Sequence, residues 1–297
     1  MSVDLLVQKI KEKGNPSVAG LDPKIEYVPE YIRKKAYAEY GQNLKGATEG
    51  LIDALYDVVP AVKPQSAFYE MYGLCGEEVM HRTISYAKEK GLYIILDVKR
   101  NDIGSTAEAY SKAYLGKVDI DGVECEPCPV DCVTVNPYLG TDGIQPFVND
   151  CKTFDKAIFA LVKTSNPSSG ELQDLLVGDE HIYEKVAQCV NKWNEETIGK
   201  SGYGAVGAVV GATYPEQAKV LRKLMPKSYF LVPGYGAQGG GAEGVKPCFN
   251  EDGLGAIVNS SRGIMCAYKK GDWKEEQFAE AARAEAIRMK NDLTSVL

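Results

Sequence analysis

The chain has 297 residues, of which 44% are apolar and 25% are charged, a composition typical of a soluble globular protein. Its 34 Lys and Arg against 41 Asp and Glu give a net charge of −7. This balance argues against a general nucleic-acid-binding protein, which needs a basic face, and no run of about 18 apolar residues predicts a membrane-spanning helix.

The cysteine content and the N-terminal segment point to a reducing compartment. Eight Cys in 297 residues are too few for a disulfide scaffold. Residues 1–15 lack the apolar run and the small-residue cleavage site of a signal peptide. We therefore expect a cytoplasmic protein whose cysteines are free thiols.

Short apolar runs recur along the chain, and each is followed by a polar residue and then by an amphipathic segment. Apolar runs without clean alternation are typical of strands that are buried on both faces of a parallel sheet. The eight runs are residues 17–21, 58–62, 93–96, 132–135, 157–162, 205–210, 229–232 and 256–258.

Helical patterns fill much of the sequence between these runs, at residues 43–58, 76–90, 107–114, 180–196, 215–224 and 274–293. Eight strands that alternate with helices predict an α/β protein with a (β/α)₈ TIM barrel, although an open doubly wound sheet shows the same alternation. No Pro-, Gly- or Ser-rich linker divides the chain. We therefore expect one domain over residues 1–297, with an irregular insertion near residues 122–132.

The sharpest motif follows the third apolar run, between Asp97 and Thr106. Side chains alternate along a strand, so Asp97 and Lys99 are expected on the same side, with Asp102 in the loop beyond. Thr106 suits the N-cap or first turn of a helix, where backbone N–H groups attract anions. A salt bridge at the end of a strand, beside a capped helix, explains these residues about equally well.

Lys63 changes this balance, because it ends the neighbouring predicted strand. Lys63, Asp97, Lys99 and Asp102 then alternate in charge, and such a network holds its ammonium groups charged and fixed in place. A preorganised cation stabilises a negative charge that develops only in the transition state. The pattern therefore favours a catalytic site at the carboxyl ends of the strands.

The Lys63 segment together with the motif Asp97-x-Lys99-x-x-Asp102-Ile103 resembles the orotidine 5′-phosphate decarboxylase family. The resemblance runs from Gly20-Leu21-Asp22 to Ser261-Arg262-Gly263-Ile264, and Thr164-Ser165-Asn166-Pro167 favours the longer form of the family. It implies an enzyme without a cofactor that converts orotidine 5′-monophosphate to UMP and CO₂, the last step of de novo pyrimidine nucleotide synthesis.

The resemblance also implies roles for the charged residues. Lys99 stabilises the carbanion at C6 of the pyrimidine and protonates it, and Asp97 lies beside the departing carboxylate. Lys63 anchors the network and the ribose hydroxyls. Asp102 and Thr106 reach into the site of a partner subunit, which implies a homodimer with shared active sites.

Phosphate is expected near the last two predicted strands, because loops after strands 7 and 8 of β/α barrels often form a phosphate site. Arg262 follows the eighth run and offers a bidentate fork. The segment Gly234-Tyr235-Gly236-Ala237-Gln238-Gly239 matches a dinucleotide motif, but loop residues follow it rather than a helix. By the resemblance, Gln238 and Arg262 bind phosphate, Ser165 reads the pyrimidine edge, and Asp22 binds the ribose.

Two alternatives stay open. A sister barrel uses the same Asp-x-Lys-x-x-Asp frame on a sugar phosphate with Mg²⁺, although it needs an acidic ligand where this chain has Lys63. An inactive phosphate-binding barrel or a Cys-rich interaction module is the other. Cys125, Cys128 and Cys132 have part of the spacing of a metal site, but a structural zinc needs four ligands. We expect free thiols and no metal.

Overall fold

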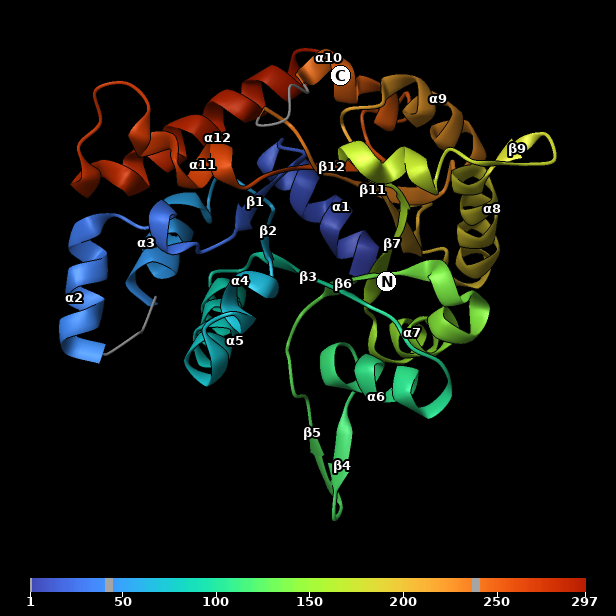
Figure 1. The fold of residues 1–297 in the computed structure, drawn as a ribbon, viewed down its shortest axis with the longest axis horizontal. Coiled ribbons are helices and arrows are strands. Elements are labelled where there is room, and N and C mark those ends of the chain that lie inside the picture. Colours follow the sequence, from blue (N-terminus) through green and yellow to red (C-terminus); the bar gives the residue numbers. More distant parts are fainter. Residues whose placement is uncertain (1, 41–44, 237–240) are drawn as a thin grey trace. The chain divides into compact units, whose positions relative to one another are not determined.

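The computed structural model describes residues 2–40, 45–236 and 241–297 (Figure 1). Eight parallel strands form a closed barrel in the order β1, β12, β11, β10, β7, β6, β3, β2. The predicted (β/α)₈ fold is thereby confirmed, and the open sheet is excluded. The barrel strands are β1 (Ser17–Leu21), β2 (Ala61–Pro64), β3 (Tyr93–Arg100), β6 (Cys132–Val135), β7 (Ala157–Lys163), β10 (Gly204–Val210), β11 (Ser228–Val232) and β12 (Ala256–Ser260).

The apolar runs behave as expected for strands that are covered on both faces. Every residue of β1, β2, β6, β10, β11 and β12 is buried. In β3 the burial continues up to Val98 and ends at Lys99, which is exposed. The core of the molecule therefore lies along the strands, and polar groups begin where the strands end.

Helices precede, connect and follow the strands along the chain. They are α1 (Ser2–Lys13), α2 (Glu30–Tyr40), α3 (Lys45–Leu55), α4 (Ala67–Glu70), α5 (Gly73–Glu89), α6 (Gly104–Tyr114), α7 (Thr141–Phe154), α8 (Ile182–Asn194), α9 (Pro215–Leu224), α10 (Ala242–Val245), α11 (Arg262–Met265) and α12 (Phe278–Thr294). Helix α9 coincides with its predicted range, whereas α2 and α7 were not predicted.

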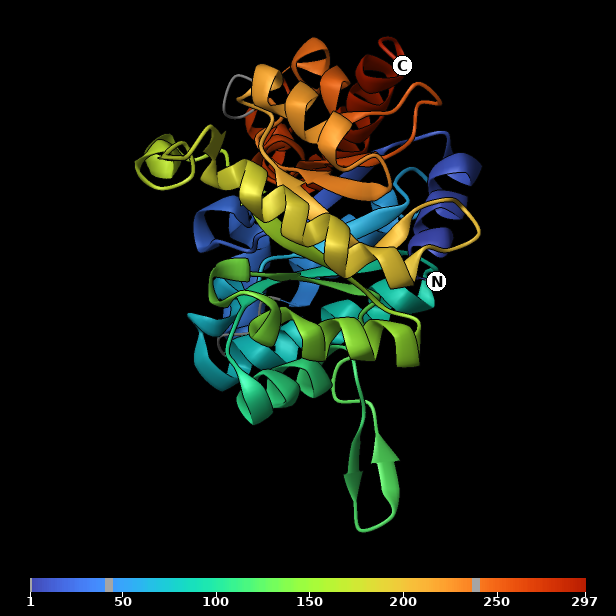
Figure 2. The ribbon, with the colours of Figure 1, turned by 90° about the vertical axis from the view of Figure 1, so that its right-hand side faces the viewer.

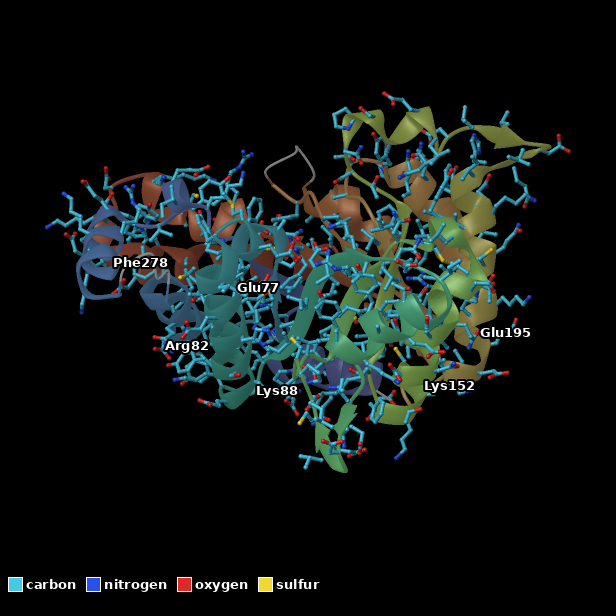
Figure 3. The ribbon with its side chains drawn as sticks, turned by 60° about the horizontal axis from the view of Figure 1, so that its bottom comes forward. Glu77, Arg82, Lys88, Lys152, Glu195 and Phe278 are labelled. Carbon is cyan, nitrogen blue, oxygen red and sulfur yellow. The ribbon has the colours of Figure 1, made fainter. Side chains whose placement is uncertain are left out.

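Helix α5 shows how these helices divide apolar from charged residues. Its buried side includes Val79, Met80 and Ile84, while Arg82 and Lys88 are exposed (Figure 3). Such an apolar stripe is the usual pattern of a helix that covers a sheet. No helix in the described residues is both long enough and apolar enough to cross a membrane.

The chain divides into two compact units. The first comprises residues 1–8, 99–258 and 296–297, and the second comprises residues 9–98 and 259–295. Within the first unit, parallel pairs join β6 to β7, β7 to β10, β10 to β11 and β11 to β12. Within the second, β2 pairs with β1 and β3. That residues 1–297 form a single domain stays a prediction.

The first unit carries a β-hairpin where an irregular insertion near residues 122–132 was predicted. Strands β4 (Val118–Ile120) and β5 (Val123–Cys125) pair antiparallel and project away from α6 (Figures 1 and 2). Asp121 and Gly122 form the turn with φ values of 52° and 84°. Positive φ at both central residues is the type I′ geometry, for which Asp-Gly is a strong signal. Residues 123–125 are therefore strand, and only the remainder is irregular.

A second hairpin lies in the connection between β7 and α8. Strands β8 (Leu176–Val177) and β9 (Glu180–His181) pair antiparallel with two residues between them. The segment follows the carboxyl end of a barrel strand, whereas the β4–β5 hairpin precedes the amino end of β6. The two hairpins thus belong to opposite kinds of barrel loop.

Candidate active site

The predicted site residues end the barrel strands or follow them closely, which is where β/α barrels carry their chemistry. The second unit contains Asp22, Lys63, Asp97 and Arg262, and the first contains Lys99, Asp102, Thr106 and Ser165. Gln238, together with Gly239 and Gly240, lies outside the described residues.

Lys63 and Asp97 form a buried ion pair in the second unit. The Nζ atom of Lys63 donates a hydrogen bond to Oδ2 of Asp97 at 2.9 Å. Burial alone would lower the pKa of Lys63, but the charges of Asp97 and Asp22 outweigh burial and raise that pKa above its usual value. Lys63 is therefore a fixed positive charge at neutral pH.

Gln65 is a site residue that sequence reasoning missed. It forms a bridge with Asp97 beyond the end of β2, and its Nε2 atom donates to Oδ2 of Asp97 at 2.9 Å. Two donors on one carboxylate oxygen fix the orientation of the Asp97 side chain. The available signal was spacing, because Gln65 stands two residues after Lys63 and strand alternation places such residues on one side.

Lys99 has an unusual backbone conformation at the end of β3. Its φ is 47°, in the left-handed region that few residues other than glycine adopt. Its backbone N–H donates to Oγ1 of Thr134 in β6 at 2.9 Å. Lys99 is therefore not in an extended conformation. The alternation of side chains along β3 ends before it, so alternation gives no reason to expect Lys99 on the same side as Asp97. Strained residues of this kind cluster at active sites.

Asp102 and Thr106 lie on either side of the start of α6. Oδ1 of Asp102 accepts a hydrogen bond from the N–H of Ile103 at 2.8 Å. Ile103 is the N-cap, and Thr106 is exposed in the first turn of α6. Of the two positions predicted for Thr106, the structure shows the first turn and not the N-cap. Both residues thus lie at a helix N-terminus, where backbone N–H groups favour negative charge.

Gly143 explains how α7 packs against the loop that carries Asp102. A Cβ atom at Gly143 would lie 2.5 Å from Oδ1 of Asn101 and 2.9 Å from the carbonyl oxygen of Asp102. Real Cβ atoms do not approach other atoms so closely. Only glycine therefore allows the first turn of α7 to contact this loop, and the contact fixes the backbone at Asp102.

Ser165 follows β7 and is held against the end of β10. A Cβ atom at Gly211 would lie 2.8 Å from both Cα and Cβ of Ser165, so the two backbones are in close contact. The carbonyl oxygen of Ser165 accepts from Oγ1 of Thr213 at 3.5 Å. The position of Ser165 is thus set by its neighbours in the first unit.

Asp22 and Arg262 follow β1 and β12. The N–H of Asp22 donates to the sulfur of Met265 in α11 at 3.1 Å, and Arg262 is the first residue of that helix. A Cβ at Gly20 would lie 1.9 Å from Oγ of Ser261. Glycine at this position thus lets the chain after β12 pack directly on β1.

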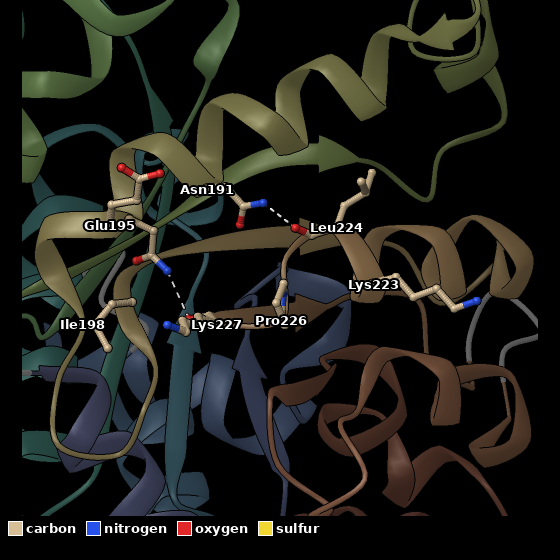
Figure 4. Close-up of a pocket in the computed structure, with 8 residues that line it drawn as sticks. Asn191, Glu195, Ile198, Lys223, Leu224, Pro226 and Lys227 are labelled. Atoms are coloured by element: carbon tan, nitrogen blue, oxygen red, sulfur yellow. Dashed lines mark hydrogen bonds between the residues drawn. The ribbon is translucent and has the colours of Figure 1, made fainter.

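A cavity of about 410 Å³ lies elsewhere in the first unit, near the amino ends of β10 and β11 (Figure 4). Asn191 donates to the carbonyl of Leu224, and Asn194 donates to the carbonyl of Lys227 at 3.1 Å. These amides serve the packing of α8 against the segment before β11. The amino ends of barrel strands are the stability end of such folds, so this cavity is not the candidate active site.

All eight cysteines are free. Cys125 is exposed, while Cys128 and Cys132 are buried. Within the ranges that the structure describes, no group of three or more His, Cys, Asp or Glu side chains gathers as metal ligands. Burial raises the pKa of the Cys248 thiol to about 12, which keeps it protonated at neutral pH.

Comparison with known proteins finds relatives that match nearly the whole chain. The model of the orotidine 5′-phosphate decarboxylase / HUMPS family matches residues 20–275. Orotidine 5′-phosphate decarboxylases from Caldicellulosiruptor bescii and Rhodopirellula baltica are 44% and 45% identical, over 99% and 96% of this chain and 98% and 96% of their own. The structure of Leishmania donovani OMP decarboxylase has a TM-score of 0.77 at 29% identity, covering 99% of this chain and 98% of that chain. The chain therefore belongs to the orotidine 5′-phosphate decarboxylase / HUMPS family.

Proposed function

We propose that this chain is a carboxy-lyase that converts orotidine 5′-monophosphate to UMP and CO₂, with Lys63, Asp97, Lys99 and Asp102 as its catalytic residues. The observation that carries the proposal is the buried Lys63–Asp97 pair, two residues along β3 from Lys99, in a chain of this family. UMP formation in this way is the last step of de novo pyrimidine nucleotide synthesis.

The reaction forms a carbanion that the protein must stabilise by electrostatic interactions. When the bond between C6 and the carboxylate breaks, the electron pair stays on C6 in the plane of the ring, where no conjugated system absorbs it. Lys99 stabilises this carbanion by its positive charge and then transfers a proton from Nζ to C6. The products are CO₂, UMP and a neutral lysine side chain, which regains a proton from water.

Lys63 and Asp97 prepare this step. Asp97 keeps its orientation through the two hydrogen bonds to Oδ2, from Lys63 and Gln65. In the proposal it lies beside the departing carboxylate, and Lys63 contacts the ribose hydroxyls. Fixed charges of this kind need no reorganisation when the charge of the transition state develops.

The remaining residues bind the nucleotide. Asp22 contacts the ribose, Ser165 reads the edge of the pyrimidine, and Gln238 and Arg262 bind the phosphate. The Arg262 guanidinium suits a phosphate because its parallel N–H groups match two phosphate oxygens.

The active protein is proposed to be a cytoplasmic homodimer in which Asp102 and Thr106 reach the site of the partner. Exposed apolar side chains near these residues support an interface. Ile103, Tyr138 and Leu139 are 54%, 76% and 48% exposed, and Leu139 lies beside Gly143 at the start of α7. Apolar groups gathered on a surface are typical of contacts between proteins. The free cysteines fit a reducing cytoplasm.

The direct test is a spectrophotometric assay with orotidine 5′-monophosphate in the presence of EDTA. We expect turnover by the wild-type chain and nearly complete loss in Lys99→Ala, with an unchanged circular dichroism spectrum. Activity that survives Lys99→Ala would refute the role of Lys99. Turnover of a sugar phosphate that depends on added Mg²⁺ would favour the sister barrel, and UMP binding without turnover would favour an inactive binder.

A further inference from the structure

Lys163, the last residue of β7, has a completely buried side chain two residues before Ser165. Its Nζ atom donates to Oγ of Ser169 at 3.0 Å and lies 2.8 Å from Oδ1 of Asp174. The ammonium also lies 4.4 Å from the centre of the Tyr214 ring, within the range of a cation–π contact. A buried charge is tolerated only when it is well paired, and these contacts supply the pairing.

Two of these partners lie on the loop that carries Ser165. Ser169 belongs to the 3₁₀ turn Pro167–Glu171, and Asp174 lies just beyond it. The chain thus leaves β7 at Lys163, passes through Ser165 and returns over the ammonium. The Lys163 side chain thereby holds Ser169 and Asp174, on the returning part of the loop, close to the end of β7.

Further contacts fix the base of the same loop. Gln173 accepts from the N–H of Thr164 at 2.9 Å and donates to Oγ1 of Thr164 at 2.8 Å. The hydroxyl of Tyr214 donates to the carbonyl of Asn166 at 3.5 Å. Thr164 is therefore tied to the residue next to Asp174, and Asn166 is tied to Tyr214, whose ring contacts the Lys163 ammonium.

We infer that Lys163 is a positioning residue for recognition of the pyrimidine base. Its ammonium pins the loop after β7, and the pinned loop holds Ser165 where its hydroxyl meets the base. Lys163 touches no substrate and acts through Ser165. The inference rests on the proposed function in one respect, the contact between Ser165 and the base.

The test compares two ligands by titration calorimetry. UMP carries the base, whereas ribose 5-phosphate has the sugar and the phosphate without it. The proteins are wild type, Ser165→Ala, Lys163→Met and the double variant. Ser165→Ala is expected to raise the Kd for UMP about tenfold, the effect of one hydrogen bond. Lys163→Met is expected to do the same, and both variants leave the Kd for ribose 5-phosphate within about twofold.

The double variant is the sharper measurement. If Lys163 acts through Ser165, the two changes are not additive, and the double variant binds UMP no more than about twofold more weakly than either single variant. A product of the two single effects would overturn the inference. Equal weakening of UMP and ribose 5-phosphate by Lys163→Met would overturn it as well.

Lys156 provides a matched control at the other end of the same strand. It immediately precedes β7, is 8% exposed, and contacts Oε1 of Glu126 and the carbonyl of Val130, each at 2.7 Å. Lys156→Met removes the same charge without touching the loop of Ser165. It is expected to leave UMP affinity unchanged, and base-selective weakening in this variant would count against a specific role for Lys163.

A second variant covers the case in which Lys163→Met does not fold. Asp174 is 37% exposed, and an Asn at this position keeps an oxygen that can accept a hydrogen bond from the buried Lys163 ammonium. We expect about threefold weaker binding of UMP and unchanged binding of ribose 5-phosphate, because the Lys163 ammonium loses its charged partner. Unchanged UMP binding would overturn the inference. If Ser165→Ala leaves UMP affinity unchanged, the role of Ser165 fails and the inference with it, whereas turnover of orotidine 5′-monophosphate by the wild type would still support the proposed reaction.

Discussion

The ammonium of Lys63 and the carboxylate of Asp97 lie 2.9 Å apart, with only 5% and 8% of their side chains exposed. Removing one partner of such a pair leaves the other charge buried without compensation. Lys63→Met is therefore expected to lower the free energy of unfolding by about 3–5 kcal/mol, in addition to its effect on activity.

Gln65→Met is the graded control for this change. It removes a neutral donor from the same carboxylate oxygen, so the expected loss is about 1 kcal/mol. Urea unfolding at pH 7 measures both variants. Losses of equal size would show that the charge of Lys63 has no special part in holding Asp97.

The left-handed backbone of Lys99 predicts a conflict between stability and activity. A residue with a Cβ atom pays about 1–2 kcal/mol in this region, whereas glycine adopts it freely. Lys99→Gly is expected to be more stable than Lys99→Ala by about 1 kcal/mol, although both lack activity. Urea unfolding of the two variants checks this, and a less stable glycine variant would contradict it.

Gly143→Ala is expected to displace the loop of Asp102, because the new Cβ would lie 2.9 Å from the backbone carbonyl oxygen of Asp102. We predict at least about a tenfold fall in kcat/KM from such a displacement of the catalytic groups. Gln145→Ala on the exposed side of the same helix is the control and should retain full activity. Wild-type kinetics in Gly143→Ala would show that the loop tolerates the extra methyl group.

Asp4 predicts a dependence of stability on pH. Partial burial would raise its pKa, but hydrogen bonds from Ser201 and Lys200 lower it from 3.8 to about 2. A lowered pKa contributes stability that is complete above pH 3.8 and is lost as the pH falls towards 2. Asp4→Asn is therefore expected to be less stable than wild type at pH 7, by an amount on the order of 1 kcal/mol given the partial exposure of Asp4.

Thermal unfolding from pH 7 to pH 2 measures this contribution. The difference between Asp4→Asn and wild type should shrink below pH 3.8 and be mostly lost by pH 2. A difference that stays constant over this range would assign the effect to something other than the charge of Asp4.

The shared-site dimer predicts complementation between two inactive chains. Lys99→Ala lacks the proton donor, and Asp102→Ala lacks the residue proposed to reach the partner. A mixed dimer pairs an intact Lys99 on one chain with an intact Asp102 on the other, so one of its two sites is complete. Up to about half of the wild-type activity per mixed dimer is expected.

Two differently tagged chains show whether subunits exchange in this experiment. Activity that returns only after exchange supports the shared site. No recovery after demonstrated exchange would place Asp102 in the site of its own chain.

The strands were predictable because a strand that is buried on both faces needs apolar residues, and each appears in the sequence as an apolar run of three to six residues. Helix α7 was not, because Gly143 and Pro146 weaken its helical pattern. Its buried face, with Ile144, Phe147 and Val148, outweighs these two residues once the helix packs. The β4–β5 turn was readable in principle, since Asp121-Gly122 is flanked by alternating residues, but the segment was predicted as an irregular insertion with free thiols.

The site was predictable in its parts and not in its details. Lys63 and Asp97 could be expected as neighbours because they end consecutive predicted strands. Gln65 could not be singled out, since polar residues are common after any strand. The φ of Lys99 depends on packing and on the contact with Thr134 across to β6, and no local sequence pattern encodes such a contact.

The β4–β5 hairpin also makes this protein easy to attach to other materials. It precedes the amino end of β6, and barrel loops of that kind open away from the end that carries the chemistry. Cys125 on this hairpin is exposed, as are Cys75 and Cys189. With the latter two replaced by serine, a single thiol remains on the outside of the described chain, so a dye or a solid support can be coupled there while the catalytic end faces solution.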